Sequence, residues 1–169
     1  MCIRDSNGAA GELGHMVIHQ NGHPCTCGRK GCLEAYASAA ALVSRAREAM
    51  ERSDESMLWS LCKGDLSGVN GRMIFEASEK GDSTACEVLD GFMEDLSEGI
   101  ANIINILQPE ILCIGGGLSG AGEALLAPVK EKTAPKIYSR ASQKNTRILL
   151  AELGNGAGII GAACLNEQR

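Results

Sequence analysis

Apolar residues recur at every third or fourth position along three stretches of the chain, which is the spacing of amphipathic helices. The first stretch covers residues 33–51, and the second covers residues 72–80. The third begins after Asp82 or Ser83, either of which is a suitable N-cap, and continues until Pro109 stops it. The spacing therefore predicts three helices, of which the last and longest would form the spine of the domain.

Short, continuous apolar runs follow the long helix. Residues 111–114 and 147–152 are predicted to be strands, and we expect both faces of the first to be buried, as in a parallel or mixed sheet covered by helices. Further helices are predicted at about 121–133 and 157–165, the second of them after a turn at 154–156. Because strands and helices alternate, the predicted fold class is α/β.

A strand-like alternation marks the N-terminal part of the chain. Over residues 12–19, His15 and His19 fall on the same face, and Asn21-Gly22 follows as a turn signal. The pattern predicts a hairpin that swings a histidine of the first arm back over the residues that follow the turn.

The segment after this turn is rich in thiols. Thiolate and imidazole are the ligands that zinc prefers, and three cysteines with one histidine close a tetrahedral, structural site. The hairpin could supply either His15 or His19, and the spacing leaves that choice open, while His23 is cramped by its closeness in sequence. The three thiols are Cys25, Cys27 and Cys32.

Length and composition bound the function classes. A chain of 169 residues suits one domain with a substantial core, and a net charge of −5 without a basic stretch gives no electrostatic footprint for nucleic acid. The sequence has no apolar run of membrane-spanning length and no secretory signal, so no membrane partner is expected. Further cysteines lie among apolar residues, which favours buried thiols in a reducing cytoplasm: Cys62, Cys86, Cys113 and Cys164.

The motif E-L-G-H at 12–15, followed by C-x-C-G-x-x-G-C-x-E at 25–34, resembles the signature of the ROK family (repressors, open reading frames and sugar kinases). The resemblance extends from about Asn7 to the C-terminus and is closest to the bacterial glucokinases of that family. It implies a set of zinc ligands, namely His15, Cys25, Cys27 and Cys32. It also implies a set of residues that hydrogen-bond sugar hydroxyls, namely Glu12, His15 and Glu34.

The resemblance makes physical sense of the spacing. A zinc-bound imidazole keeps one free N–H that usually finds an oxygen partner, so His15 could join the metal to a sugar. The carboxylates of Glu12 and Glu34 are acceptors only, whereas hexose hydroxyls also donate. His19 and His23 match no role in the family, and we expect both to face solvent.

A glycine cluster, Gly115-Gly116-Gly117, follows the first predicted strand, where a backbone can approach phosphate oxygens closely. Taken literally, this region also contains G-x-G-x-x-G. However, no acidic residue closes the next strand to bind ribose, so a dinucleotide site is not expected. The resemblance instead implies that the stretch around Gly115, Gly116 and Gly117 is part of an ATP site, and that residues 154–158 pack the last helix.

The resemblance implies the C-terminal half of an actin-like ATPase (ribonuclease H-like) fold with a zinc-binding hairpin or loop insertion. Residues 1–6 match nothing expected there and are predicted to be a foreign leader, with the sugar- and zinc-binding part at 7–169. The implied reaction is phosphorylation of a hexose, most simply glucose, by ATP with magnesium. No catalytic base is assigned here, because in the family it lies in an N-terminal domain that this sequence lacks, and no turnover is expected from this chain alone.

Two alternatives remain at this stage. Some ROK proteins are sugar-responsive transcriptional repressors with the same zinc and sugar module, and other ROK kinases act on fructose, N-acetylmannosamine or N-acetylglucosamine. The resemblance also implies that the full-length protein is a homodimer or homotetramer. No residue in the sequence distinguishes these sugars by itself.

Overall fold

The computed structural model describes residues 7–153 and 156–164, so the predicted leader at 1–6 and parts of the last turn and last helix lie outside the described residues. The helices are α1 (Glu34–Ala37), α2 (Ala39–Met50), α3 (Leu58–Leu61), α4 (Gly71–Glu79), α5 (Ser83–Leu107), α6 (Glu123–Thr133) and α7 (Ala157–Cys164). The strands are β1 (Ile111–Ile114) and β2 (Arg147–Leu150). The described residues also form the 3-10 turns η1 (Leu13–His15), η2 (Leu66–Gly68), η3 (Gly117–Ala121) and η4 (Ala134–Lys136).

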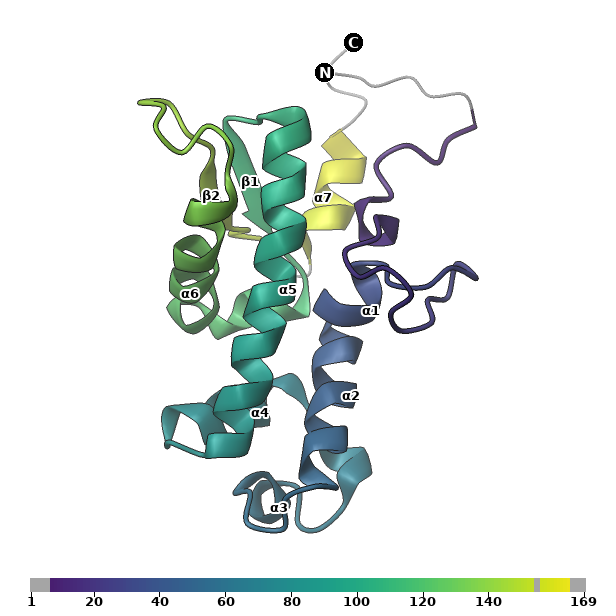
Figure 1. Ribbon diagram of the computed structural model, residues 1–169, viewed down its shortest axis with the longest axis vertical. Coiled ribbons are helices and arrows are strands. Elements are labelled where there is room, and N and C mark those ends of the chain that lie inside the picture. Colours follow the sequence, from purple (N-terminus) through teal and green to yellow (C-terminus); the bar gives the residue numbers. More distant parts are fainter. Residues whose placement is uncertain (1–6, 154–155, 165–169) are drawn as a thin grey trace.

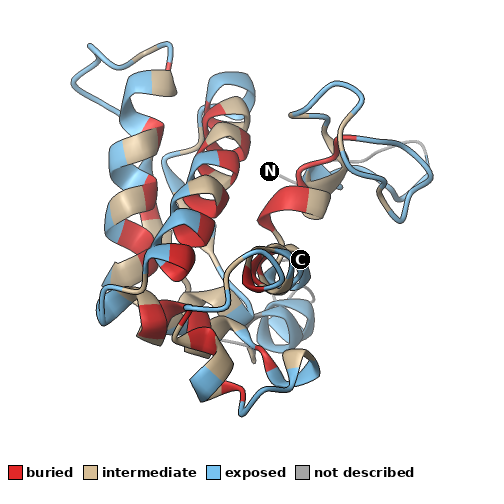
Figure 2. Cartoon of the chain, turned by 60° about the horizontal axis from the view of Figure 1, so that its bottom comes forward, coloured by how far each residue is buried: buried red, intermediate tan, exposed pale blue. Residues whose placement is uncertain are grey.

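Helix α5 is the predicted spine. The Asp82 carboxylate caps its N-terminus by accepting a hydrogen bond from the backbone N–H of Ala85 at 2.7 Å, and Gln108 ends it in the left-handed conformation directly before Pro109. The helix runs between α6 and the sheet on one side and α1 and α2 on the other (Figure 1). Figure 2 shows that the buried residues lie on the helix faces that meet. The largest fully buried side chains include Phe92, Leu42, Met50, Ile74 and Leu125.

The sheet is parallel but only half covered. Strands β1 and β2 pair in register from Ile111 with Arg147 to Ile114 with Leu150. Along β1 exposed and half-buried residues alternate, and Ile111 is 43% exposed, so the predicted burial of both faces is wrong for this chain. The reason is that Leu112 and Ile114 pack against the helical core, whereas in the described part of the chain the opposite face lacks such a cover.

The predicted helix at 33–51 is interrupted at Ser38. This residue has extended backbone (φ −84°, ψ 162°), and its hydroxyl accepts a hydrogen bond from the N–H of Ala41 at 3.1 Å. It therefore ends α1 and caps α2 at the same time. The apolar stripe continues through both helices because both pack against α5, which is why periodicity alone predicts one helix.

The predicted strand at 12–19 is also wrong. The structure has the 3-10 turn η1 there, followed by one isolated antiparallel bridge between Val17 and Cys32. The turn at Asn21-Gly22 is confirmed, because Asn21 has a left-handed backbone (φ 59°) and the N–H of Gly22 donates to the carbonyl of His19. The segment is thus a hairpin-like loop with little regular pairing.

All cysteines in the described part of the chain are free thiols. Cys62 is buried as predicted, but Cys86, Cys113 and Cys164 are exposed, which contradicts the expectation of buried thiols. An apolar neighbourhood in sequence does not bury a residue on a helix or strand face that nothing covers. Among the described residues, no helix is both long and apolar enough to span a bilayer.

Candidate metal and sugar site

The cysteine-rich loop is shaped by two close backbone approaches. Antiparallel bridges join Val17 to Cys32 and Pro24 to Lys30, and the N–H of Gly31 donates to the carbonyl of His23 at 2.8 Å. Gly31 has φ 80°, and a Cβ atom on it would lie 1.7 Å from the carbonyl oxygen of His19. Only glycine fits this position, so the loop can fold back over the histidine segment that precedes it.

The four zinc ligands implied by the resemblance come together in the structure. The donor atoms of His15, Cys25, Cys27 and Cys32 all lie within 4.8 Å of one another. The sulfur of Cys25 is 3.5 Å from Nδ1 of His15, and the sulfurs of Cys27 and Cys32 are 3.7 Å apart. A tetrahedral ion with ordinary zinc–sulfur bonds needs donor atoms about 3.5–3.8 Å apart. The donor set and its spacing therefore fit a structural zinc ion.

The choice of histidine is decided by where the two rings point. His15 turns Nδ1 toward the sulfur of Cys25, which leaves Nε2 as the nitrogen available to a second partner. His19 points away from the cysteines, and its Nε2 lies 2.6 Å from a carboxylate oxygen of Asp95 on α5. His15 is thus the fourth member of the cluster. His19 and His23 are both exposed, as expected, but His19 also makes this contact with Asp95, which the sequence did not predict.

The thiols of the cluster differ in acidity. A hydrogen bond from the backbone N–H of Cys27, supported by side-chain hydrogen bonds from Cys27, Cys32 and His15, lowers the pKa of Cys25 to about 6. Burial raises the pKa of Cys32 to about 11, and hydrogen bonds and charge from the other two cysteines act in the same direction. Near neutral pH the loop therefore offers one preformed thiolate to a cation, while Cys32 must lose a proton on metal binding.

Glu34 lies directly beside the metal cluster. It is the first residue of α1, and one of its carboxylate oxygens accepts a hydrogen bond from the hydroxyl of Thr26 at 2.9 Å. The turn η1 approaches it closely, since a Cβ atom on Gly14 would lie 3.5 Å from Cβ of Glu34 and 3.7 Å from Oε2. Because His15 directly follows Gly14 in η1, this turn places the histidine of the cluster near the Glu34 side chain.

Glu12 occupies the other end of this arrangement. It precedes η1, its carbonyl accepts a hydrogen bond from the N–H of His15 at 3.0 Å, and it is exposed. A hollow of about 440 Å³ opens on the loop side of Glu34, lined among others by Cys25, Thr26 and Ser44. Of the three residues expected at the sugar, Glu34 lines this hollow, whereas His15 lies in η1 and Glu12 directly precedes that turn. Carboxylate acceptors near an imidazole suit a polyhydroxy ligand.

The glycine cluster borders a second and larger cavity. Gly116 has a left-handed backbone (φ 77°), its carbonyl accepts hydrogen bonds from Ser119, and Gly117 begins η3. A cavity of about 840 Å³ lies between η3, α4 and α2, and its lining includes Gly117, Leu118, Asn70 and Phe75. Of the three glycines expected at the nucleotide, Gly117 lines this cavity, whereas Gly115 and Gly116 form the turn that leads to it. The cavity is large enough for a nucleotide.

Contacts that the sequence did not reveal tie the loop to the helices, although they involve a residue on the predicted apolar stripe. Tyr36 of α1 lies under the loop, where its hydroxyl accepts a hydrogen bond from the N–H of His23 at 2.6 Å. Its ring packs against those of His19 and His23, with centroids 4.5 and 4.9 Å away. The sequence signal that could have indicated Tyr36 is its place two residues after Glu34, on the opposite side of the first turn of α1.

Comparison with known proteins shows to which family the chain belongs. The sequence profile of the ROK family matches residues 2–169. A glucokinase of Thermotoga maritima is 38% identical over 167 residues, which cover 98% of this chain and 51% of that protein. The DNA-binding transcriptional dual regulator NagC of Escherichia coli is 31% identical over 153 residues, covering 90% of this chain and 36% of that protein.

A solved structure gives the same answer for the fold. The crystal structure of a ROK family glucokinase from Streptomyces griseus, in complex with glucose and AMPPNP, matches with a TM-score of 0.85 and 32% identity. The match covers 95% of this chain and 52% of that chain. The fold is therefore the α/β fold of ROK kinase structures, and the chain spans about half the length of the glucokinases it matches.

Proposed function

The chain belongs to the ROK family, and on that premise we propose that it is the sugar- and zinc-binding part of a glucokinase, which transfers the terminal phosphoryl group of ATP to glucose. The observation that carries the proposal is the close approach of η1, the turn that contains His15, to the Glu34 side chain, beside the cluster of His15 and three cysteines. The similarity to glucokinases, including one solved with glucose, supports glucose as the sugar.

The residues of this chain have separable tasks in the proposed reaction. Zinc held by His15, Cys25, Cys27 and Cys32 would supply only structural rigidity, because four protein ligands leave no open position. His15 would offer its free ring nitrogen to a sugar hydroxyl, and Glu12 and Glu34 would each accept hydroxyl protons in hydrogen bonds. These contacts orient the ring so that its 6-hydroxyl can face the phosphoryl donor, which removes much of the entropic barrier.

The nucleotide is assigned to the cavity beside η3. The turn at Gly115, Gly116 and Gly117, in which Gly116 has a positive φ, can bring backbone N–H groups close to phosphate oxygens, while Leu118 and Phe75 offer an apolar wall to the base. A magnesium ion on the phosphates would neutralise charge in the transition state. The catalytic base is assigned to a part of the full-length protein outside this sequence, so the 169-residue chain is expected to bind sugar without turnover.

The sugar assignment is tested by removing the charge of Glu34. The variant Glu34→Gln keeps the size of the side chain but replaces one acceptor oxygen by an amide, so glucose affinity measured by calorimetry should fall at least tenfold. The matched control is Glu48→Gln, because Glu48 lines the same hollow from α2 and contacts Ser44. Equal affinity of wild type and Glu34→Gln for glucose would contradict the proposal.

A second candidate function rests on the similarity to NagC. In a repressor the same module would bind sugar as an effector, and a DNA-binding segment would come from outside this sequence. Determining the coding sequence upstream of residue 7 separates the two. A D-x-G-x-T phosphate loop supports the kinase, whereas a helix-turn-helix there would replace it by the repressor.

We also propose a cellular location and an assembly state for the protein. Free thiols throughout the described residues suit a reducing cytoplasm. The full-length protein is proposed to be a homodimer or homotetramer. Light scattering on the full-length protein at two concentrations tests this, and a mass of one chain at both would contradict it.

A further inference from the structure

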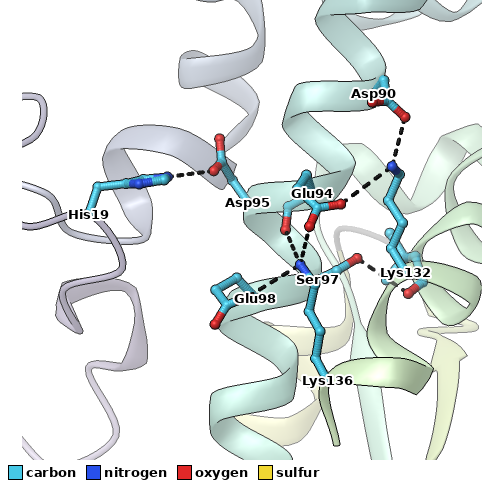
Figure 3. A network of polar contacts seen from close by, with 9 residues as sticks. His19, Asp90, Glu94, Asp95, Ser97, Glu98, Lys132 and Lys136 are labelled. Carbon is cyan, nitrogen blue, oxygen red and sulfur yellow. Dashed lines mark hydrogen bonds and ion pairs between the residues drawn. The ribbon is translucent and has the colours of Figure 1, made fainter.

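Asp95 is a buried carboxylate in the middle of α5 that faces the zinc loop rather than the sheet (Figure 3). One oxygen, Oδ1, lies 2.6 Å from Nε2 of His19, and the other, Oδ2, is hydrogen-bonded by the guanidinium of Arg45 on α2. A buried carboxylate is costly unless each oxygen is paired, and here both are. Asp95 thereby joins α5, α2 and the loop at one point.

Tyr36 supports His19, the loop residue in this contact. The ring of His19 packs on Tyr36, which in turn accepts the hydrogen bond from the backbone of His23. Gly22 passes so close that a Cβ atom there would lie 2.0 Å from the Tyr36 hydroxyl. His19 is consequently held on two sides, by a charged partner at its Nε2 and by an aromatic ring against its face.

Two other acidic residues of α5 form ion pairs with lysines of α6 and η4. Asp90 pairs with Lys132 at 2.7 Å, and Glu94 pairs with Lys136, so both residues connect α5 to the segment of α6 and η4. Figure 3 shows these pairs on the side of α5 away from His19. Asp95 is therefore distinct in position from the ladder of acidic residues on the same helix.

We propose that Asp95 is a positioning residue for the sugar site. By holding His19, which lies one short segment after His15, it fixes the zinc loop against the body that carries Glu34 and so sets the separation of the two sugar-binding groups. The part of this inference that concerns sugar rests on the proposed function. The part that concerns the anchoring of the zinc loop does not.

The loop needs attachment to the helices in addition to its metal cluster. Zinc ties His15 to the cysteines of the same loop, which makes the loop rigid in itself but does not attach it to the helices. At α1 the loop is attached through the buried Cys32 and Leu33 and through the hydrogen bond from the N–H of His23 to Tyr36. At α5 it is attached through the His19–Asp95 contact, in addition to the packing of Met16 and Ile18 against the core. Loss of the His19–Asp95 contact removes the polar attachment to α5 and leaves the arm that carries His15 and His19 less constrained.

The test compares Asp95→Asn with Asp90→Asn in the zinc-loaded chain. Both variants remove one carboxylate charge from α5, but only the first loosens the loop. Hydrogen exchange should accelerate about tenfold at the N–H of Ile18 and of Gly31, both of which bond across the loop, while exchange within α5 stays unchanged. Zinc release to a chelator should also accelerate, because the arm that carries His15 is then less constrained.

A pair of substitutions at His19 keeps the proposal falsifiable if Asp95→Asn does not fold. His19→Ala, on an exposed loop residue, should reproduce the loosening. His19→Gln, which places an amide donor near Nε2, should restore wild-type exchange and zinc release. If loss of the hydrogen bond to Asp95 were not the cause of the loosening, His19→Gln would give no such rescue. The anchor is overturned if Asp95→Asn and His19→Ala match Asp90→Asn in loop exchange and in zinc release.

Glucose titration of the same proteins tests the sugar part. We expect Asp95→Asn to bind glucose about tenfold more weakly than Asp90→Asn, with one zinc still bound to each. Unchanged affinity despite a loosened loop would overturn the positioning role and retain the anchor. Absence of glucose binding in the wild-type chain would contradict the proposed function for this chain and, with it, the sugar part, while loop exchange and zinc release still decide the anchor.

Discussion

Substitution of Gly99 by alanine should destabilise the chain, even though alanine is the better helix former. Gly99 is buried in α5 where α1 crosses it, and a Cβ atom there would lie 2.5 and 2.6 Å from the two methyl carbons of Leu33. Ordinary carbon contacts are about 3.5–4.0 Å, so the helices or the leucine must move by about 1 Å. Leu33 directly precedes Glu34, so that movement reaches the site.

Two opposing terms set the magnitude. Replacing glycine by alanine inside a helix stabilises by about 1 kcal/mol, whereas overpacking a core contact costs about 1–3 kcal/mol. Because Leu33 is only 9% exposed and belongs to the hydrophobic core, it has little room to give way, and the clash should prevail by about 1–2 kcal/mol. For a chain of this size, each kcal/mol lowers the melting temperature by about 2–4 °C.

Thermal unfolding of the zinc-loaded protein measures this effect. The control is Gly161→Ala in α7, where a Cβ atom would have nothing within 4 Å and only the helix-forming term remains. The double variant Gly99→Ala/Leu33→Ala should lose less stability than the two single variants together, by about 2–3 kcal/mol, which is the cost of the clash that it removes. A Gly99→Ala protein as stable as wild type would refute the reasoning about this crossing.

Three further outcomes follow from the loop and its helices. Gly31→Ala should lower the zinc content below one ion per chain, because the added Cβ atom meets the carbonyl of His19. The control Gly28→Ala, which is also at positive φ but in open space, should retain zinc. Equal zinc contents of the two variants would contradict this prediction. In zinc-free protein, the rate of alkylation of Cys25 should fall as the pH drops through about 6, where its thiolate becomes protonated, and bound zinc should protect Cys25 from alkylation. A midpoint of this pH dependence near the usual cysteine pKa of about 8.5 would contradict the prediction. Ser38→Ala should cost about 1 kcal/mol in denaturant unfolding through loss of the α2 cap, and no change would argue against the cap.

Sequence reasoning succeeded where local chemistry decides the structure. Helix α5 could be predicted because its apolar period is long and Asp82 is a strong N-cap, and the turn at Asn21 could be predicted from its dipeptide. The grouping of the three cysteines could be predicted from ligand type and spacing. The histidine that joins them could not, since either His15 or His19 could reach, and only the family resemblance and the structure point to His15.

The predictions that were wrong or missing concern contacts between residues distant in sequence, and whether another element covers a given face of a helix or strand. No local pattern indicates that His19 meets Asp95, which is 76 residues away. The outer face of β1 looks like a buried strand in sequence because apolar residues do not reveal which element covers them. Ser38 interrupts a helix whose apolar stripe is unbroken, because a single hydroxyl cap outweighs the periodic signal.

Zinc content per chain, combined with glucose calorimetry before and after chelation, tests the central claim most directly. The claim is that a zinc ion held by His15 and three cysteines supports a sugar site that includes Glu34. It predicts one zinc per chain in folded, reduced protein, and glucose binding that is lost on chelation and regained when zinc is restored. Folded, reduced protein that takes up no zinc, or glucose affinity that is unaffected by its removal, would contradict the claim.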